Sequence, residues 1–102
     1  MLIAGLLAVT AINTGDDLLA ACVGQGRDKL ACTATVMGVA DGVALAGADA
    51  HQKLLCVRAH LRPSDLVEAV RKYLDAHPET RSKSATALTY RALKEALPCP
   101  PG

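Results

Sequence analysis

The sequence DKLACTATVMGVADGVAL, from Asp28 to Leu45, is a long apolar stretch without proline, and it decides the fold. It is long enough for about five helical turns. Apolar residues would lie on nearly every side of that helix, whereas an ordinary surface helix has a single apolar face. We therefore expect a helix over residues 28–45 that is buried at the centre of the fold.

A stripe of small residues recurs every four positions along this helix, at Ala34, Gly38, Gly42 and Ala46. Two glycines inside a helix cost roughly 1 kcal/mol each relative to alanine, so close packing has to compensate for them. The stripe predicts a close neighbour. That neighbour is either another helix of the same core or a second copy of the chain, which would place the stripe at a homodimer seam.

The whole chain is short enough to form one domain, and it contains only two aromatic residues, both tyrosine. Few segments alternate apolar and polar residues as strands do. We predict an all-α fold, a small four-helix bundle, in which three further helices pack around the central one. The first of these helices would begin at Thr14 or Gly15. The next would begin at Pro63 and end at the His77-Pro78 step, and the last would be capped by Ser82 or Ser84.

The first residues, Met1 to Ala11, form an apolar run that ends in small residues. The run is too short to span a bilayer, and it fits the apolar part of a secretory signal peptide, although no basic residue precedes it. We expect a signal peptide at 1–11 and a single helical domain at 12–102, exported and not membrane-bound afterwards. A lipoprotein signal at Leu19 to Cys22 is an alternative, but Asp16 and Asp17 lie inside the region that would have to be apolar.

Four cysteines allow three pairings, and an exported chain of this size would use them as two disulfides. If the helices alternate in direction, all four cysteines lie near one pole of the bundle. We expect Cys32 to pair with Cys56 and Cys22 to pair with Cys99. In the cytosol, the same residues would instead be thiols or metal ligands.

The sequence carries no recognisable catalytic pattern, and we expect neither an enzyme nor a cofactor. Cys56 and His60, with His51 nearby, are the best metal-ligand candidates, but they lack the spacing of an established zinc motif, so we expect no metal. Asp41, in the middle of the central helix, is the one acidic residue that could be buried. Eleven basic and ten acidic residues nearly cancel, which argues against nucleic-acid binding.

Taken together, these features resemble the type VI secretion amidase immunity proteins, the Rap/Tai family. The resemblance covers residues 14–99 and rests on the order and spacing of the cysteines, the central glycines and two proline elements. The residues that carry it are TGDDLL at 14–19, Cys22, Ala31-Cys32, GVADG at 38–42, Cys56, VRKYLDAHPE at 70–79 and ALKEALPC at 92–99.

The resemblance implies a periplasmic, helical, disulfide-bonded protein, often a homodimer, that binds a peptidoglycan amidase effector and occludes its active site. By position, the charged connection after the third helix, helped by the exposed side of that helix, would make this contact; the alternative is a plain solvated connection between helices. Two other interpretations remain. One is a small periplasmic chaperone-like protein of the acid-stress type, and the other is a cytosolic zinc or thiol protein. The candidate effector-binding residues are His77, Glu79, Thr80, Arg81 and Lys83.

Overall fold

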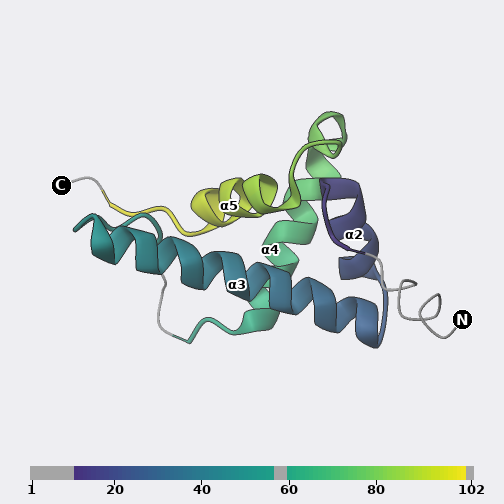
Figure 1. Ribbon diagram of the computed structural model, residues 1–102, viewed down its shortest axis with the longest axis horizontal. Coiled ribbons are helices and arrows are strands. Elements are labelled where there is room, and N and C mark those ends of the chain that lie inside the picture. Colours follow the sequence, from purple (N-terminus) through teal and green to yellow (C-terminus); the bar gives the residue numbers. More distant parts are fainter. Residues whose placement is uncertain (1–10, 57–59, 101–102) are drawn as a thin grey trace, which may run out of the picture.

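The computed structural model describes residues 11–56 and 60–100. Except for Ala11, the predicted signal peptide lies outside these residues. The described chain contains four α-helices and one short 3-10 helix, and no strand, which confirms the predicted all-α class (Figure 1). The helices are α2 (Gly15–Val23), α3 (Arg27–Asp49), α4 (Pro63–Ala76), η1 (Pro78–Thr80) and α5 (Ala85–Ala96).

Side chains bond backbone amide groups at the start of three helices. The Thr14 hydroxyl accepts a bond of 3.2 Å from the Asp17 amide, and the Asp17 carboxylate accepts one of 3.1 Å from the Thr14 amide. Ser84 caps α5 in the same way through the Ala87 amide, at 3.3 Å. At α4 the N-cap residue is Arg62, and the Asp65 carboxylate, three residues on, accepts from the Arg62 amide at 2.9 Å.

The core lies where α2, α4 and α5 meet one side of α3. One apolar face of α4 and one of α5 are buried here, and leucine supplies most of the volume. One polar residue is buried with it, Thr89, whose hydroxyl is satisfied because it donates to the Ala85 carbonyl at 2.7 Å. The largest fully buried side chains are Leu18, Leu74, Leu88, Leu93, Val36 and Val70.

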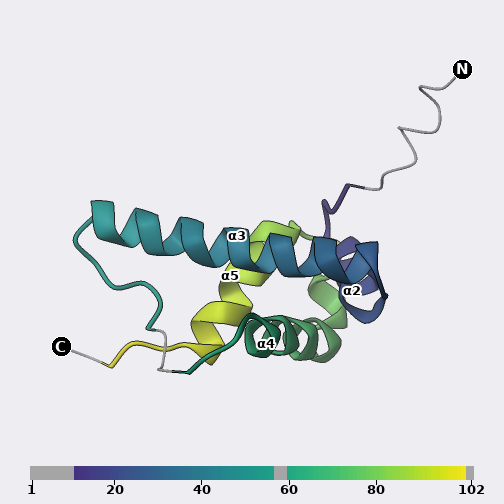
Figure 2. The ribbon, with the colours of Figure 1, turned by 90° about the horizontal axis from the view of Figure 1, so that it is seen from below.

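The prediction that the long apolar helix is buried at the centre is wrong. Figure 2 shows α3 along one edge of the molecule and α4 along the other. Only Cys32, Val36 and Gly47 of α3 are buried, and Asp41 is exposed. The physical reason is size, because three short helices are enough to cover one side of a 23-residue helix but not to surround it.

The long helix also runs further than expected, to Asp49 and not to Leu45. It ends where His51 adopts a left-handed backbone conformation, with φ of 56°. This turn lets the Gln52 amide donate to the Gly47 carbonyl at 2.7 Å. The chain folds back so closely that a side chain at Gly47 would collide with the Gln52 carbonyl, so glycine is required there.

All four cysteines form disulfides, but the predicted pairing is wrong. Cys22 bonds Cys32, and Cys56 bonds Cys99. The glycine-containing turn between α2 and α3 folds the two helices against each other, so the last turn of α2 meets the start of α3 directly. Cys56 in turn lies beside the end of α5, where its amide donates to the Leu97 carbonyl at 3.1 Å.

Candidate functional site

The connection of residues 77–83, predicted to contact an effector, is a tight and internally bonded loop. Pro78 ends α4 and starts the single turn of η1. The Thr80 amide and hydroxyl both bond the His77 carbonyl, at 3.0 and 2.9 Å. The Lys83 amide then bonds the Thr80 carbonyl at 2.9 Å. The loop therefore has a defined backbone before any partner binds.

The start of α2 fixes this loop to the body of the molecule, and Figure 1 shows the two side by side. The Gly15 amide donates to the Lys83 carbonyl and the Asp16 amide donates to the Arg81 carbonyl, both at 2.9 Å. A Cβ on Gly15 would collide with Leu88 and would come within 3.0 Å of the Arg81 backbone. Glycine at this position thus permits the close approach of the loop.

The five predicted site residues divide into an exposed pair, one half-buried histidine and a pair that anchors the loop. Glu79 and Lys83 are exposed and available to a partner. His77 is half-buried; its ring lies 4.3 Å from the Tyr73 ring, and its Nδ1 lies 3.5 Å from Glu79 Oε1.

Thr80 and Arg81 instead hold the loop in place. Thr80 bonds within the loop, and Arg81 Nε lies 3.3 Å from Asp16 Oδ1 across the junction with α2. That nitrogen is enclosed and has no well-aligned hydrogen-bond acceptor, so the contact is mainly one of charge. Sequence reasoning missed Asp16, because nothing in the sequence shows that α2 begins beside this loop.

The exposed side of α4, predicted to help the loop, carries an ion-pair cluster. Arg71 Nη1 lies 2.6 Å from Asp75 Oδ2, and Arg71 also bonds both carboxylate oxygens of Glu68. These bonds hold the pKa of Glu68 below its usual value and raise the pKa of Arg71. Arg71 is therefore occupied by its own helix, and the charges that α4 offers to a partner are largely compensated.

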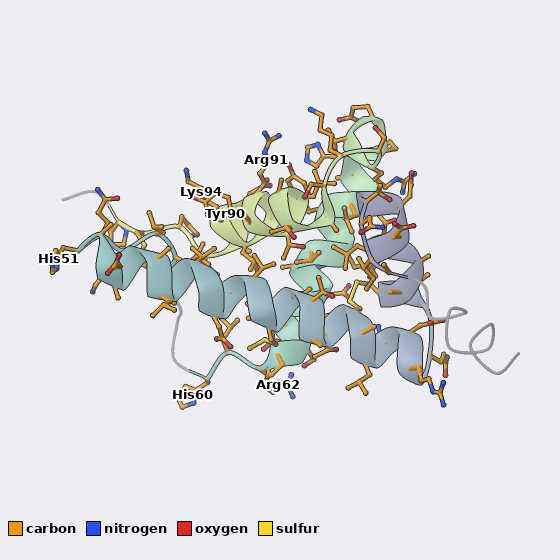
Figure 3. All side chains as sticks on the ribbon, in the orientation of Figure 1. His51, His60, Arg62, Tyr90, Arg91 and Lys94 are labelled. Atoms are coloured by element: carbon orange, nitrogen blue, oxygen red, sulfur yellow. A yellow bond between two sulfur atoms is a disulfide. The ribbon has the colours of Figure 1, made fainter. Side chains whose placement is uncertain are left out.

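A second candidate surface is the apolar groove between α3 and α5. Its volume is about 790 Å³. On the α3 side it is lined by the small residues Ala34, Gly38, Gly42 and Ala46 together with Thr35, Val39 and Val43. Ala87 and Tyr90 stand on the α5 side. Figure 3 shows Arg91 and Lys94 projecting from α5 on the side away from α3, so the wall of the groove itself stays apolar.

By length and composition alone, α3 could also cross a membrane. Its most apolar segment has a mean hydropathy of 1.5, and only 17% of it is buried. Two features tie this helix to the folded body instead. Cys32 is bonded to Cys22 of α2, and the exposed Asp41 would place a carboxylate near the middle of the helix, where a bilayer disfavours charge.

The described residues do not bring together the candidate metal ligands of the sequence, Cys56, His60 and His51. Cys56 is bonded to Cys99, which leaves it no thiolate to bind a metal. His51 and His60 lie well apart in Figure 3. Across residues 11–56 and 60–100, no three histidine, cysteine, aspartate or glutamate side chains gather closely enough to hold an ion.

Comparison with known proteins identifies the family. A family model described as Rap1a immunity proteins matches residues 14–99, which include all four helices and both disulfides. A search of curated proteins finds no match. Immunity proteins protect a cell by binding a cognate secreted effector, and in general they are not enzymes. The chain therefore belongs to the family of Rap1a immunity proteins.

Proposed function

We propose that this protein is a periplasmic immunity protein that binds a type VI secretion peptidoglycan amidase and occludes its active site, so that the producing cell is protected. The loop of residues 77–83 would enter the active-site groove of the amidase, and the protein would act as a homodimer. The observation that carries the proposal is the rigid anchoring of this loop beside α2, within a chain of an immunity family.

The two disulfides support the periplasmic location. Disulfides persist in oxidising compartments, whereas cytosolic thiols are kept reduced. All four cysteines are paired, and two of them, Cys22 and Cys32, are fully buried in the core. A peptidoglycan amidase acts in the same compartment, because its substrate lies there. An inhibitor of such an enzyme has to be stable where the enzyme attacks.

The loop has the physical properties of an inhibitory plug. Ordering a flexible loop on binding reduces affinity, and a loop that is already ordered avoids this loss. Backbone bonds to Gly15 and Asp16 provide that order here, while Glu79 and Lys83 stay exposed. The exposed pair offers one acidic and one basic group to the polar groups that line an amidase active site.

The test first looks beside this gene for one that encodes a small peptidoglycan amidase. The purified protein is then titrated into that amidase, with calorimetry and peptidoglycan cleavage as readouts. Replacing Glu79 and Lys83 with alanine is expected to weaken binding at least tenfold and to restore cleavage. The matched control replaces Lys94 and Glu95, an exposed basic and acidic pair on α5, and is expected to bind normally. Equal affinity of the loop variant and the wild type would contradict the assignment of the loop.

One observation favours the chaperone-like alternative, namely the uncovered apolar surface of α3. A chaperone of this kind would prevent the aggregation of unrelated proteins in acid, and it would need no amidase. Protection of several unrelated clients at low pH, together with no binding to the neighbouring amidase, would favour this second function over the first.

A further inference from the structure

The two disulfides of this protein differ in how closely a reagent can approach them. Cys22 and Cys32 lie inside helices and are fully buried. Cys56 and Cys99 lie outside the helices and are only half-buried. A thiolate has to reach a sulfur atom to open a disulfide, so access decides which bond reacts. The bond between Cys56 and Cys99 is therefore the one that a thiol can attack in the folded protein.

The chain on both sides of this bond is also accessible. Pro98 and Pro100, which flank Cys99, are exposed and lie outside α5. Proline does not continue a helix, so no helical turn encloses the sulfur of Cys99. On the other side of the bond, residues 51–53 are exposed as well. A second protein can therefore approach the bond along irregular chain at the surface.

The bond fixes the short segment that follows α3. We call residues 52–56 the strap, and Figure 2 shows the chain after α3 running across to the C-terminal segment beyond α5. The Gln52 amide bonds the Gly47 carbonyl at 2.7 Å, and the Cys56 amide bonds the Leu97 carbonyl at 3.1 Å. The disulfide adds a covalent tie at the second of these two points.

The strap covers apolar surface on the body of the molecule. Leu54 lines the groove between α3 and α5, and it lies beside Gly47 near the end of α3. Leu55 packs against the core. Both leucines are half-buried, and partial burial of an apolar side chain stabilises less than full burial does. These contacts therefore hold the strap only weakly when the covalent tie is cut.

We propose that the disulfide between Cys56 and Cys99 is a site of thiol–disulfide exchange with a dithiol protein, and that opening it releases the strap while the helices stay folded. A thiolate of the dithiol attacks one sulfur, the bond between the two cysteines breaks, and a mixed disulfide forms. The second thiol of the partner then displaces this link. The partner leaves as a disulfide, and Cys56 and Cys99 become thiols that hold the two electrons and two protons of the dithiol.

This inference goes beyond the proposed function and does not depend on an amidase. The helices persist because the core contains neither Cys56 nor Cys99. The buried bond between Cys22 and Cys32 still joins α2 to α3. Once the strap is released, Leu54 leaves the groove between α3 and α5. The redox state of one accessible bond thus controls how far this groove is covered, and the oxidised partner closes the bond again by the reverse exchange.

The first test treats the intact, oxidised protein with excess dithiothreitol in the absence of denaturant. Samples are quenched with acid, alkylated and mapped by mass spectrometry. Cys56 and Cys99 are expected to become thiols at least tenfold faster than Cys22 and Cys32, while circular dichroism keeps its helical signal. Equal rates for the two bonds, or loss of the helical signal at the rate of reduction, would mean that the bond opens only on unfolding and would overturn the inference.

A second test concerns the partner. Dithiothreitol is replaced by an equal concentration of a purified, reduced dithiol oxidoreductase with a C-x-x-C site. This protein is expected to open the accessible bond at least tenfold faster than dithiothreitol, because the lowered pKa of its attacking thiol makes more of the thiolate available at neutral pH. A rate no higher than that of dithiothreitol would restrict the exchange to small thiols and refute a protein partner.

Release of the strap is measured by hydrogen exchange. The Cys56 amide is expected to lose its protection on reduction, whereas the amides of α5 keep theirs. The double variant Cys56→Ala with Cys99→Ala should show the same pattern without any reductant, and its remaining bond should resist dithiothreitol. Protection of the Cys56 amide that is unchanged after reduction would show that the strap stays in place, and would refute its release.

Discussion

Removal of the disulfide between Cys56 and Cys99 should strongly destabilise the protein. This bond closes a segment with a sequence separation of 43, whereas the bond between Cys22 and Cys32 closes one of only 10. Loop-closure entropy in the unfolded chain gives a contribution of about 4 kcal/mol for the longer segment and about 2.7 kcal/mol for the shorter one. For a domain whose total stability is about 5–15 kcal/mol, the larger figure is a substantial share.

The longer bond suits this measurement because its effect is mostly entropic. Cys56 and Cys99 are half-buried, so replacing them with alanine removes little packing. Cys22 and Cys32 are completely buried, and their replacement would add a cavity to the entropic loss. The expected loss of about 4 kcal/mol for Cys56→Ala with Cys99→Ala can therefore be compared directly with the chain-entropy figure.

The assay is urea unfolding followed by circular dichroism, after non-reducing peptide mapping of the wild type has verified both pairs. Each single alanine variant breaks the same bond, so the two single variants and the double variant should lose the same stability. A loss below about 1 kcal/mol would refute the entropic argument. Additive losses from the two single variants would show that the cysteines act separately, and recovery of a peptide joining Cys32 to Cys56 would refute the pairing itself.

Two further predictions concern the core and the helix cap. Leu93→Ala, at a fully buried position, should reduce the free energy of unfolding by about 2–5 kcal/mol, and a loss below about 1 kcal/mol in the same urea assay would contradict its place in the core. Backbone bonds from Thr14 and Asn13 hold the pKa of Asp17 below its ordinary value of 3.8. Because the folded pKa is the lower one, this stabilisation is present above the unfolded pKa and is lost as the pH falls through the folded pKa. Unfolding measured from pH 5 to pH 2 should therefore show a steeper loss for the wild type than for Asp17→Asn, and identical slopes would exclude this role.

The local signals in the sequence predicted the helices well. Thr14, Pro63 and Ser84 mark helix starts that the structure confirms, and the His77-Pro78 step ends α4 as expected. These boundaries depend on hydrogen bonds and backbone restrictions within a few residues of the boundary. The same locality explains why the candidate loop could be placed between two helices from the sequence alone.

The sequence could not predict how the elements meet. The anchoring of Arg81 by Asp16, and of the loop by Gly15, depends on α2 lying beside a segment far away in the chain. Nor could the sequence predict how many residues of α3 are buried, because the apolar pattern of a helix is the same whether its faces pack in a core or stay at the surface. This is why Asp41 and most of α3 proved to be exposed.

The sequence by itself determined an all-α chain with four helices, their caps and four cysteines suited to disulfides, because these properties follow from local backbone chemistry and composition. Only the tertiary structure decided which cysteines pair, which face of α3 stays open and which residues hold the loop. Those outcomes depend on the turn that folds α2 against α3 and on the limited size of the other helices. Each is a matter of how the helices pack against one another, which no short stretch of sequence specifies.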